Sequence, residues 1–508
     1  MNTFLDGLVN ENNYAYTENG AVTHKTTKSA VLDMFALCGA YRSRTNEDCI
    51  LAFQNALEEN VTLALKCLFY LRDCRGGQGE RRFFRVCYKW LCEKYPDVAR
   101  RNLALVSEYG RWDDLLYVTE DTPLFADAIA IVKAQFKLDL DCKTPSLLGK
   151  WLPSENASSP KTKKLASKVR ASFGVTHKQY RQALSLLRTR INIVEKLMSE
   201  GRWDEIEFDK IPSKAGLIYK NAFARRDMIA KKYETFAKSE KTTVNAAVLN
   251  PVDIAHRIFI NYQLVRQDAN STDRLMLQKY WDNLKDYYNG RQENGLAIVD
   301  TSGSMSGTPL EAAVSMGAYI AERGHGPFAN HFVTFSSHPE LVKFSGVDIV
   351  DKFNRAKSAD WQMDTNIEAV FDMLLKVAKQ ENTKPEDMPE RLYIFSDMEF
   401  NGCITSNKYD ARSYSYRNYR SYRSLDSADK VETLLEGIAR KWAEAGYELP
   451  KVVFWNLDAR SQNIPALGGR FSYVSGFSMS MVESILSGKD GYDLMLEVLE
   501  SERYAAIQ

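Results

Sequence analysis

Leu296-Ala297-Ile298-Val299-Asp300-Thr301-Ser302-Gly303-Ser304 is an apolar run followed directly by one carboxylate and three hydroxyls. The run predicts a short buried strand, so the polar residues lie where that strand ends. An Asp and two Ser oxygens bent around a glycine suit Mg²⁺, which takes about six oxygen ligands and usually keeps several waters. The sequence therefore predicts a cation site at the carboxyl end of a strand.

Thr308-Pro309-Leu310-Glu311 comes next and predicts the start of a helix. Thr is a favoured cap, Pro fits the first helical position, and an acidic residue suits the first turn. The dipole at the beginning of a helix favours anions and opposes a cation. We therefore expect this helix end to help hold an anionic ligand beside the ion.

Length and composition limit what this motif can explain. The 508 residues exceed one ordinary domain, and 44% hydrophobic with 26% charged residues is typical of a globular protein. We expect no membrane partner and a cytoplasmic location, because apolar runs fall short of the ~18–20 residues that cross a bilayer and no signal peptide is recognisable. Seven of the eight cysteines lie between Cys38 and Cys142 without paired zinc spacing, which indicates free thiols.

The pattern of hydrophobic residues changes near residue 295. Residues 28–290 have helical periodicity nearly throughout, with no credible alternating strand, and predict antiparallel helix pairs. Beyond residue 295, strands are expected at 296–300, 329–336, 391–397 and 451–457, and helices at 309–323, 366–379, 428–445 and 479–486. This alternation predicts a mostly parallel sheet with helices on both faces and ligands at the carboxyl ends of its strands.

Five residues of the second region form a spaced motif. Asp300, Ser302, Ser304, Thr365 and Asp397 closely resemble, in order and spacing, the metal-ion-dependent adhesion site of von Willebrand factor A domains. The resemblance implies that the serines bind Mg²⁺ directly, the threonine directly or through water, and the aspartates largely through water. It leaves one position for an Asp or Glu of a protein partner, with Mn²⁺ or Ca²⁺ as alternative ions.

The helical region carries further motifs: Asp73-Cys74-Arg75-Gly76-Gly77-Gln78-Gly79-Glu80-Arg81-Arg82, Tyr109-Gly110-Arg111-Trp112-Asp113-Asp114-Leu115, Lys150-Trp151-Leu152-Pro153 and Leu186-Leu187-Arg188. They resemble a poorly characterised family that pairs a helical module with a C-terminal A domain, an arrangement similar to the Ro ribonucleoproteins. Their TROVE module is a ring of HEAT-like helix pairs that binds RNA. The resemblance implies a multidomain chain: an all-α helical-repeat, HEAT-like TROVE module over 1–290, then an α/β doubly wound, Rossmann-like von Willebrand factor A domain over 291–508.

Positive charge is concentrated in the helical region. Residues 161–240 contain 19 Lys and Arg against 9 Asp and Glu, which indicates either a polyanion surface or solvated helix faces. The glycine-rich stretch 75–82 fits a phosphate cradle or a helix–helix turn, and the Tyr/Arg-rich stretch 409–423 fits base stacking or a solvated insertion. The RNA-binding candidates are Arg75, Arg81, Arg82, Lys161, Lys163, Lys164, Arg170, Lys178, Arg181, Arg188, Arg190, Arg225, Arg226, Tyr414, Tyr416, Arg417, Tyr419 and Arg420.

These observations favour binding over catalysis. The six histidines form no recognisable catalytic set, and Ser302 and Ser304 are expected to bind metal instead of attacking a substrate. We therefore expect a non-enzymatic RNA-binding ribonucleoprotein with a Mg²⁺-dependent docking domain. The alternatives are a protein-only scaffold or assembly factor that uses the metal site, and a metal-dependent hydrolase.

Overall fold

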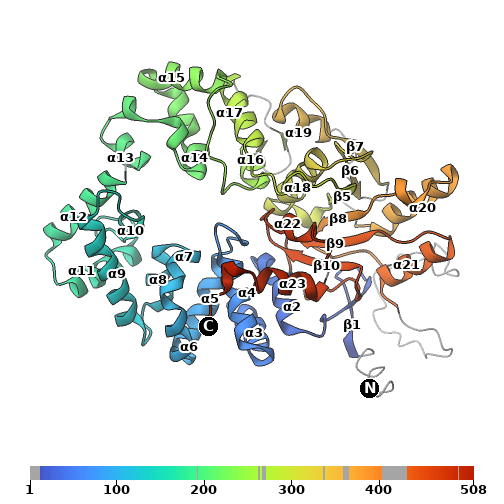
Figure 1. Ribbon diagram of the computed structural model, residues 1–508, viewed down its shortest axis with the longest axis horizontal. Coiled ribbons are helices and arrows are strands. Elements are labelled where there is room, and N and C mark those ends of the chain that lie inside the picture. The colour runs from blue at the N-terminus through green and yellow to red at the C-terminus, as the bar shows by residue number, and fades with distance from the viewer. Residues whose placement is uncertain are drawn as a thin grey trace, which may run out of the picture.

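The protein forms a ring that closes through a sheet. The computed structural model describes residues 12–191, 193–260, 264–265, 271–335, 338–357, 365–402, 432–489 and 491–508. Figure 1 shows an arc of helices that begins beside the sheet, runs outward, and returns to the sheet from the other side. Within the described residues, no helix combines the length and apolarity needed to cross a membrane.

The first half of the arc consists of short helices packed in sequence order. They are α2 (Ala30–Leu37), α3 (Asn46–Glu59), α4 (Val61–Arg72), α5 (Arg82–Lys94), α6 (Pro96–Asn102), α7 (Val106–Tyr109), α8 (Trp112–Thr119) and α9 (Phe125–Asp141). Local signals place their ends: Thr45 and Asp48 form a capping box at α3, and Asn60 caps α4. Neighbouring helices bury apolar side chains between them, as the periodicity predicts.

The second half continues to the far side of the sheet. Its helices are α10 (Leu148–Trp151), α11 (Pro160–Phe173), α12 (His177–Arg190), α13 (Val194–Ser199), α14 (Ser213–Arg225), α15 (Asp227–Lys238), α16 (Pro251–Ile258) and α17 (Ser271–Asp282). The expectation of no strand between residues 28 and 290 is wrong at one place in the described chain, where β3 (Phe259–Ile260) and β4 (Leu264–Val265) form a two-residue antiparallel pair.

The sheet has six strands in the order β10-β9-β8-β5-β6-β7. They are β5 (Gly295–Asp300), β6 (His331–Phe335), β7 (Glu340–Lys343), β8 (Arg391–Ser396), β9 (Lys451–Asn456) and β10 (Phe471–Ser475). All neighbours are parallel except β7, which pairs antiparallel with β6 at the edge. Every residue of β5 and β8 is buried, as expected for central strands covered on both faces. The sheet thus supports the predicted α/β architecture.

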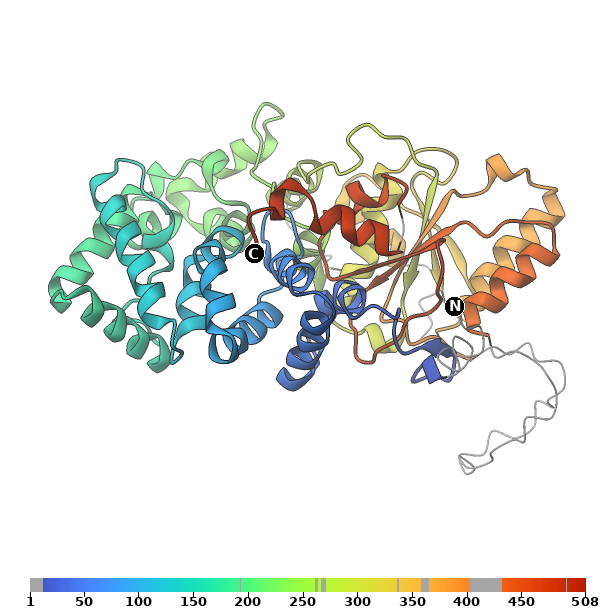
Figure 2. The ribbon, with the colours of Figure 1, turned by 60° about the horizontal axis from the view of Figure 1, so that its bottom comes forward.

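Helices cover the sheet: α18 (Thr308–Arg323), α19 (Ile349–Lys357), α20 (Ile367–Glu381), α21 (Leu434–Glu444), α22 (Met481–Ile485) and α23 (Gly491–Leu499). Figures 1 and 2 show α20 and α21 on the side away from the arc, and α22 and α23 on the side nearer to it. The predicted strands and helices of this region match within a few residues, except that the helix expected at 428–445 begins at Leu434; residues 428–431 of that prediction lie outside the described residues. The strands β7 and β10 and the helices α19 and α23 were not predicted.

Both ends of the described chain pack against distant segments. The hairpin of β1 (Tyr14–Tyr16) and β2 (Val22–His24) pairs with residues beyond β8 and β9, through bridges Gly20–Asn401 and His24–Ile464. At the other end, Arg503 forms an ion pair with Asp73 after α4. Residues on either side of position 290 share one hydrophobic core. The boundary at 290 therefore marks a change from helices to alternating strands and helices. The N-terminal residues nevertheless pack against the sheet.

Candidate functional site

The loop after β5 brings the first three motif residues together. Asp300 is fully buried at the end of the strand, and its Oδ1 accepts a hydrogen bond from the Ser302 amide at 2.9 Å. The Oγ atoms of Ser302 and Ser304 lie 3.0 Å apart. Gly307, with φ of 100°, then turns the chain into α18. One carboxylate and two hydroxyls thus gather at the carboxyl end of β5.

The end of the neighbouring strand β8 adds a second carboxylate. Ser396 Oγ donates to Asp300 Oδ2 at 2.5 Å, and the buried Asp397 follows. Burial, and then the charge of Asp397, raise the pKa of Asp300 to about 7. Among the described residues, no Lys or Arg forms an ion pair with Asp300. A buried carboxylate without a cationic partner is costly, and a bound cation would remove that cost.

Thr365 joins this edge through residues that follow β8. Its hydroxyl donates to Asn401 Oδ1 at 3.1 Å and accepts from Asn19 Nδ2 at 3.0 Å. The same Asn19 amide group donates to the carbonyl of Glu399, two residues after Asp397. The N-terminal hairpin therefore touches the predicted metal ligand Thr365 directly.

Arg460, in the loop after β9, supplies a cation that the motif did not predict. Its guanidinium pairs with Asp397, and its Nη1 lies 3.7 Å from Glu18 Oε2 in the hairpin. Buried Glu399 completes the cluster and accepts hydrogen bonds from Ser461 Oγ and from the Glu18 amide. Arg460 follows a strand end on the same sheet edge, which is a usable sequence signal. Asn19 has no such signal.

The donor set at this edge is compatible with a hard cation. It offers carboxylate and hydroxyl oxygens, the ligand types that Mg²⁺ and Ca²⁺ prefer. Within the described ranges, no group of three or more His, Cys, Asp and Glu side chains is suited to a metal. A metal at this edge would therefore depend on the hydroxyls of Ser302, Ser304 and Thr365.

Several predicted RNA-binding arginines instead hold loops and helix ends. Arg82 donates to the carbonyls of Tyr41 and Arg44, Arg188 to those of Gly149 and Leu152, and Arg190 to that of Leu140. Arg75 donates to the Glu108 carbonyl, and Arg170 pairs with Glu155. Arg75 and Arg190 are exposed as well as bonded to carbonyls, and the other exposed candidates are Arg81, Lys161, Lys163, Lys164, Lys178, Arg181, Arg225 and Arg226. Tyr414, Tyr416, Arg417, Tyr419 and Arg420 lie outside the described residues.

The glycine-rich loop 75–80 is a turn that uses its own amides. The amides of Gly77 and Gly79 donate to the Asp73 carbonyl, and that of Gln78 to the Tyr70 carbonyl. A Cβ at Gly77 would lie 2.0 Å from the Tyr70 carbonyl oxygen, so only glycine fits there. Of the two interpretations of this stretch, the contacts favour the helix–helix turn.

One group of cations concentrates positive charge beside that turn. We call Arg81, Arg85, Arg111 and Lys161 the basic cluster. Partial burial, and then the charges of Arg85 and Arg111, lower the pKa of Arg81. Arg85 and Lys161 lie over the ring of Tyr117, and Arg111 stacks 3.9 Å from the centre of a Trp151 ring.

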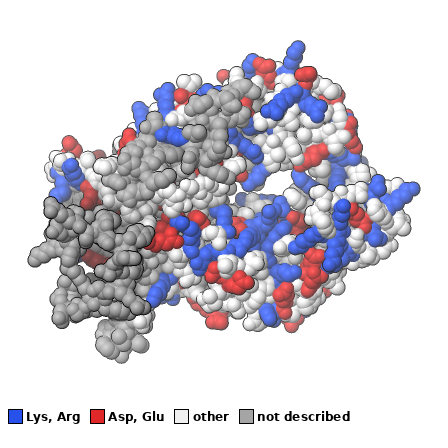
Figure 3. All heavy atoms as spheres, turned by 180° about the vertical axis from the view of Figure 1, so that it is seen from behind, with Lys and Arg blue, Asp and Glu red and all other residues white. Residues whose placement is uncertain are grey.

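Two carboxylates form ion pairs with residues of the basic cluster. Asp113 and Asp114 pair with Arg85, Asp113 also pairs with Arg111, and Asp114 is shared with the buried Arg72. Figure 3 shows Lys and Arg side chains gathered along the edge of the central opening of the ring. The cluster thus has an excess of positive charge next to aromatic faces.

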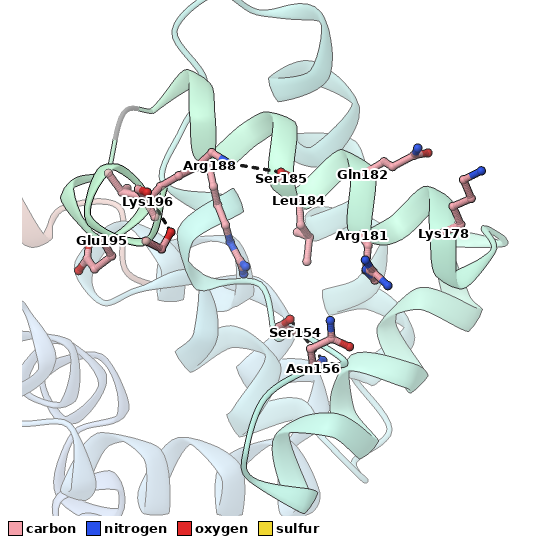
Figure 4. A pocket seen from close by; sticks show the side chains of 12 residues that line it. Ser154, Asn156, Lys178, Arg181, Gln182, Leu184, Ser185, Arg188, Glu195 and Lys196 are labelled. Atoms are coloured by element: carbon pink, nitrogen blue, oxygen red, sulfur yellow. Dashed lines mark hydrogen bonds between the residues drawn. The ribbon is translucent and has the colours of Figure 1, made fainter. Parts of the chain in front are cut away.

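A cavity of about 790 Å³ lies further along the arc, lined by residues of α12, α13 and the loop after α10. Arg181 and Arg188 project from α12 toward Ser154 and Asn156, while Lys178 points outward (Figure 4). Because Arg188 is held by backbone carbonyls, Arg181 and Lys178 are the exposed cations of this cavity.

Comparison with known proteins places the chain in a family. Residues 17–120 and 150–287 match the family described as domain of unknown function (DUF2828), and residues 294–504 match domain of unknown function (DUF7788). The crystal structure of the Deinococcus radiodurans RO (RSR) protein aligns with a TM-score of 0.48 and 13% identity, over 93% of this chain and 99% of that one. "Uncharacterized protein L728" of Acanthamoeba polyphaga mimivirus is 30% identical over 535 residues, covering 96% of this chain and 87% of that protein. The chain therefore belongs to the same family as L728, with a DUF2828 region followed by a DUF7788 region.

Proposed function

We propose that this protein binds RNA through the basic cluster of its helical region. The observation that carries the proposal is the charge excess there: Arg72, Arg85 and Arg111 share the two carboxylates of Asp113 and Asp114, and the basic cluster adds Arg81 and Lys161. Phosphates neutralise surplus cations, and unpaired bases stack on aromatic and guanidinium planes such as those of Tyr117 and Arg111.

The second part of the proposal is a Mg²⁺ site of the von Willebrand factor A type at the β5–β8 edge. Ser302, Ser304 and Thr365 would hold the ion directly, with Asp300 and Asp397 acting through water. The bound ion would offer a position to an Asp or Glu of a protein partner. The burial of the Asp300 carboxyl group supports this assignment, because no described Lys or Arg forms an ion pair with it.

We propose binding without catalysis, in the cytoplasm. Seven cysteines of the described chain are free thiols, which suits a reducing compartment. The competing proposals are a protein-only scaffold, whose affinity for RNA would be negligible, and a hydrolase, whose turnover would require Asp300.

RNA binding is tested with the full chain and a fluorescently labelled single-stranded RNA, by anisotropy over a series of salt concentrations. The double variant Arg81→Ala/Lys161→Ala removes two exposed cations. We expect weaker binding and a salt slope reduced by about 1.4, since each phosphate contact on a single strand contributes roughly 0.7.

The matched control is Lys376→Ala/Lys379→Ala, which removes two exposed lysines from α20 on the opposite side of the molecule. It should leave both affinity and slope unchanged. An affinity independent of salt in the wild-type protein would contradict RNA binding and favour the protein-only scaffold.

The metal site is tested separately by isothermal titration of the full chain with Mg²⁺. Asp300→Asn should abolish binding, because the change removes the central carboxylate while keeping its shape. Equal heats in wild type and variant would refute the site. Phosphodiester or peptide hydrolysis that is lost in Asp300→Asn would favour the hydrolase.

A further inference from the structure

The N-terminal hairpin (residues 12–26, with β1 and β2) packs its turn against the loop that follows Asp397. Thr17 Oγ1 donates to the Phe400 carbonyl at 2.6 Å, and the Glu18 amide donates to Glu399 Oε2 at 2.7 Å. The Gly402 amide donates back to the Asn19 carbonyl at 3.1 Å. Residues nearly 400 positions apart thus form one local network at the proposed metal site.

The turn is also braced internally. The Thr17 amide donates to the Ala21 carbonyl, and the Ala21 amide donates to Thr17 Oγ1, both at 2.9 Å. Gly20 has a φ of 86°, a conformation that favours glycine and lets the tip turn back. The hairpin therefore presents Asn19 in a defined position, held by the turn itself.

Asn19 and Asn401 both orient the Thr365 hydroxyl. The hydroxyl accepts from Asn19 Nδ2 and donates to Asn401 Oδ1, so its proton and one acceptor direction are both assigned. Asn401 also donates its backbone amide to the Thr365 carbonyl at 3.1 Å. Hydrogen-bond partners of this kind orient metal ligands, and their loss typically reduces metal affinity about 10- to 100-fold.

We propose that Asn19 is a positioning residue of the metal site and that docking of the N-terminal hairpin completes that site. This inference rests on the proposed Mg²⁺ site. It adds that a segment at the opposite end of the sequence controls the orientation of Thr365. Coupling between two binding events is reciprocal, so Mg²⁺ must in turn stabilise the docked hairpin by the same free energy.

The test uses the full chain and Mg²⁺ itself, with calorimetric titration of three variants. Asn19→Ala should lower the Mg²⁺ affinity about 10- to 100-fold. Tyr16→Ser is the matched control on the same hairpin, because Tyr16 is 72% exposed. It should leave the affinity unchanged. Asp300→Asn reports whether the metal site exists at all.

A second measurement requires no change to the hairpin. Hydrogen exchange of the Glu18, Ala21 and Gly402 amides is compared with and without Mg²⁺, and we expect slower exchange with the ion in wild type but not in Asp300→Asn. A purely structural role of Asn19 would lower the melting temperature equally with and without Mg²⁺. If the proposed coupling exists, Mg²⁺ should raise the melting temperature of Asn19→Ala less than it raises that of wild type.

The outcomes separate the two proposals. If wild type binds Mg²⁺ and Asp300→Asn does not, but Asn19→Ala matches Tyr16→Ser and exchange is insensitive to the ion, the role of Asn19 is refuted and the metal site stands. If wild type shows no Mg²⁺ binding, the metal site fails and the positioning role fails with it.

Discussion

Replacing Arg460 by Gln should raise the affinity of the β5–β8 edge for Mg²⁺. The Arg460 guanidinium pairs with Asp397, the carboxylate proposed to act on the ion through water. The positive charge of Arg460 already neutralises part of the negative charge of Asp397, which would otherwise attract the metal ion. Gln keeps much of the length and hydrogen-bonding capacity of the side chain while removing its charge.

The expected size follows from the charges. A doubly charged ion about 5 Å from a guanidinium is repelled by roughly 7 kcal/mol at an effective dielectric constant near 20. Movement of the side chain reduces this figure, because Glu18 Oε2 lies 3.7 Å from Arg460 Nη1 and offers an alternative partner. If about one-fifth of the repulsion remains, the variant gains about 1.4 kcal/mol, or tenfold in affinity.

The assay is calorimetric titration of metal-depleted full-length protein, with Arg440→Gln as the control. Arg440 lies on α21 and pairs with Glu432 and Glu444, away from the site. The Mg²⁺-dependent rise in melting temperature should also be larger for Arg460→Gln, because tighter binding stabilises the folded state more. An affinity equal to or below that of wild type would refute the antagonism between Arg460 and the metal.

Two further predictions concern the buried carboxylate Asp114, which accepts from Arg72 and Arg85. Asp114→Asn leaves Arg72 buried without its partner and should lower the free energy of unfolding by about 3–5 kcal/mol in urea titrations, whereas the more exposed Asp113→Asn should cost about 1 kcal/mol or less. Equal losses of unfolding free energy in Asp114→Asn and Asp113→Asn would refute this ranking. Burial alone would raise the pKa of Asp114, but Arg72 and Arg85 lower it overall. A carboxyl group with a lowered pKa stabilises the fold above its unfolded pKa of about 3.9, so the gap between wild type and Asp114→Asn should close as the pH falls below about 4. A gap that stays constant to about pH 2 would contradict the shift.

The parts of the fold that the sequence predicted are those with local signals. An apolar run followed by Asp300 marked β5, and Thr308 with Pro309 marked the start of α18. The predicted cap was wrong by one residue, because Gly307 caps the helix and Thr308 is its first residue. The edge strand β7 and the strand β10 went unpredicted, because their short, polar-interrupted stretches become strands only by pairing with β6 and β9. Strand formation there depends on tertiary contacts more than on intrinsic preference.

The same distinction applies to the site. Asp300, Ser302 and Ser304 lie within five consecutive residues, so the amino-acid sequence alone indicated their shared chemistry. The roles of Asn19 and Arg460 could not be predicted in that way, because their partners Thr365 and Asp397 lie 346 and 63 residues away. Composition likewise identified the basic stretch but not which arginines bond to carbonyls, since that depends on where helix ends meet.

Helix α2 couples the unfolding of the two sequence regions. Ser475 on β10 donates to the Phe35 carbonyl and accepts from the Gly39 amide, so a helix near the beginning of the chain covers a strand near its end. Neither sequence region keeps a complete core when the other unravels. The DUF2828 and DUF7788 regions should therefore unfold together in one cooperative transition. A substitution that destabilises either region should lower the melting temperature of both.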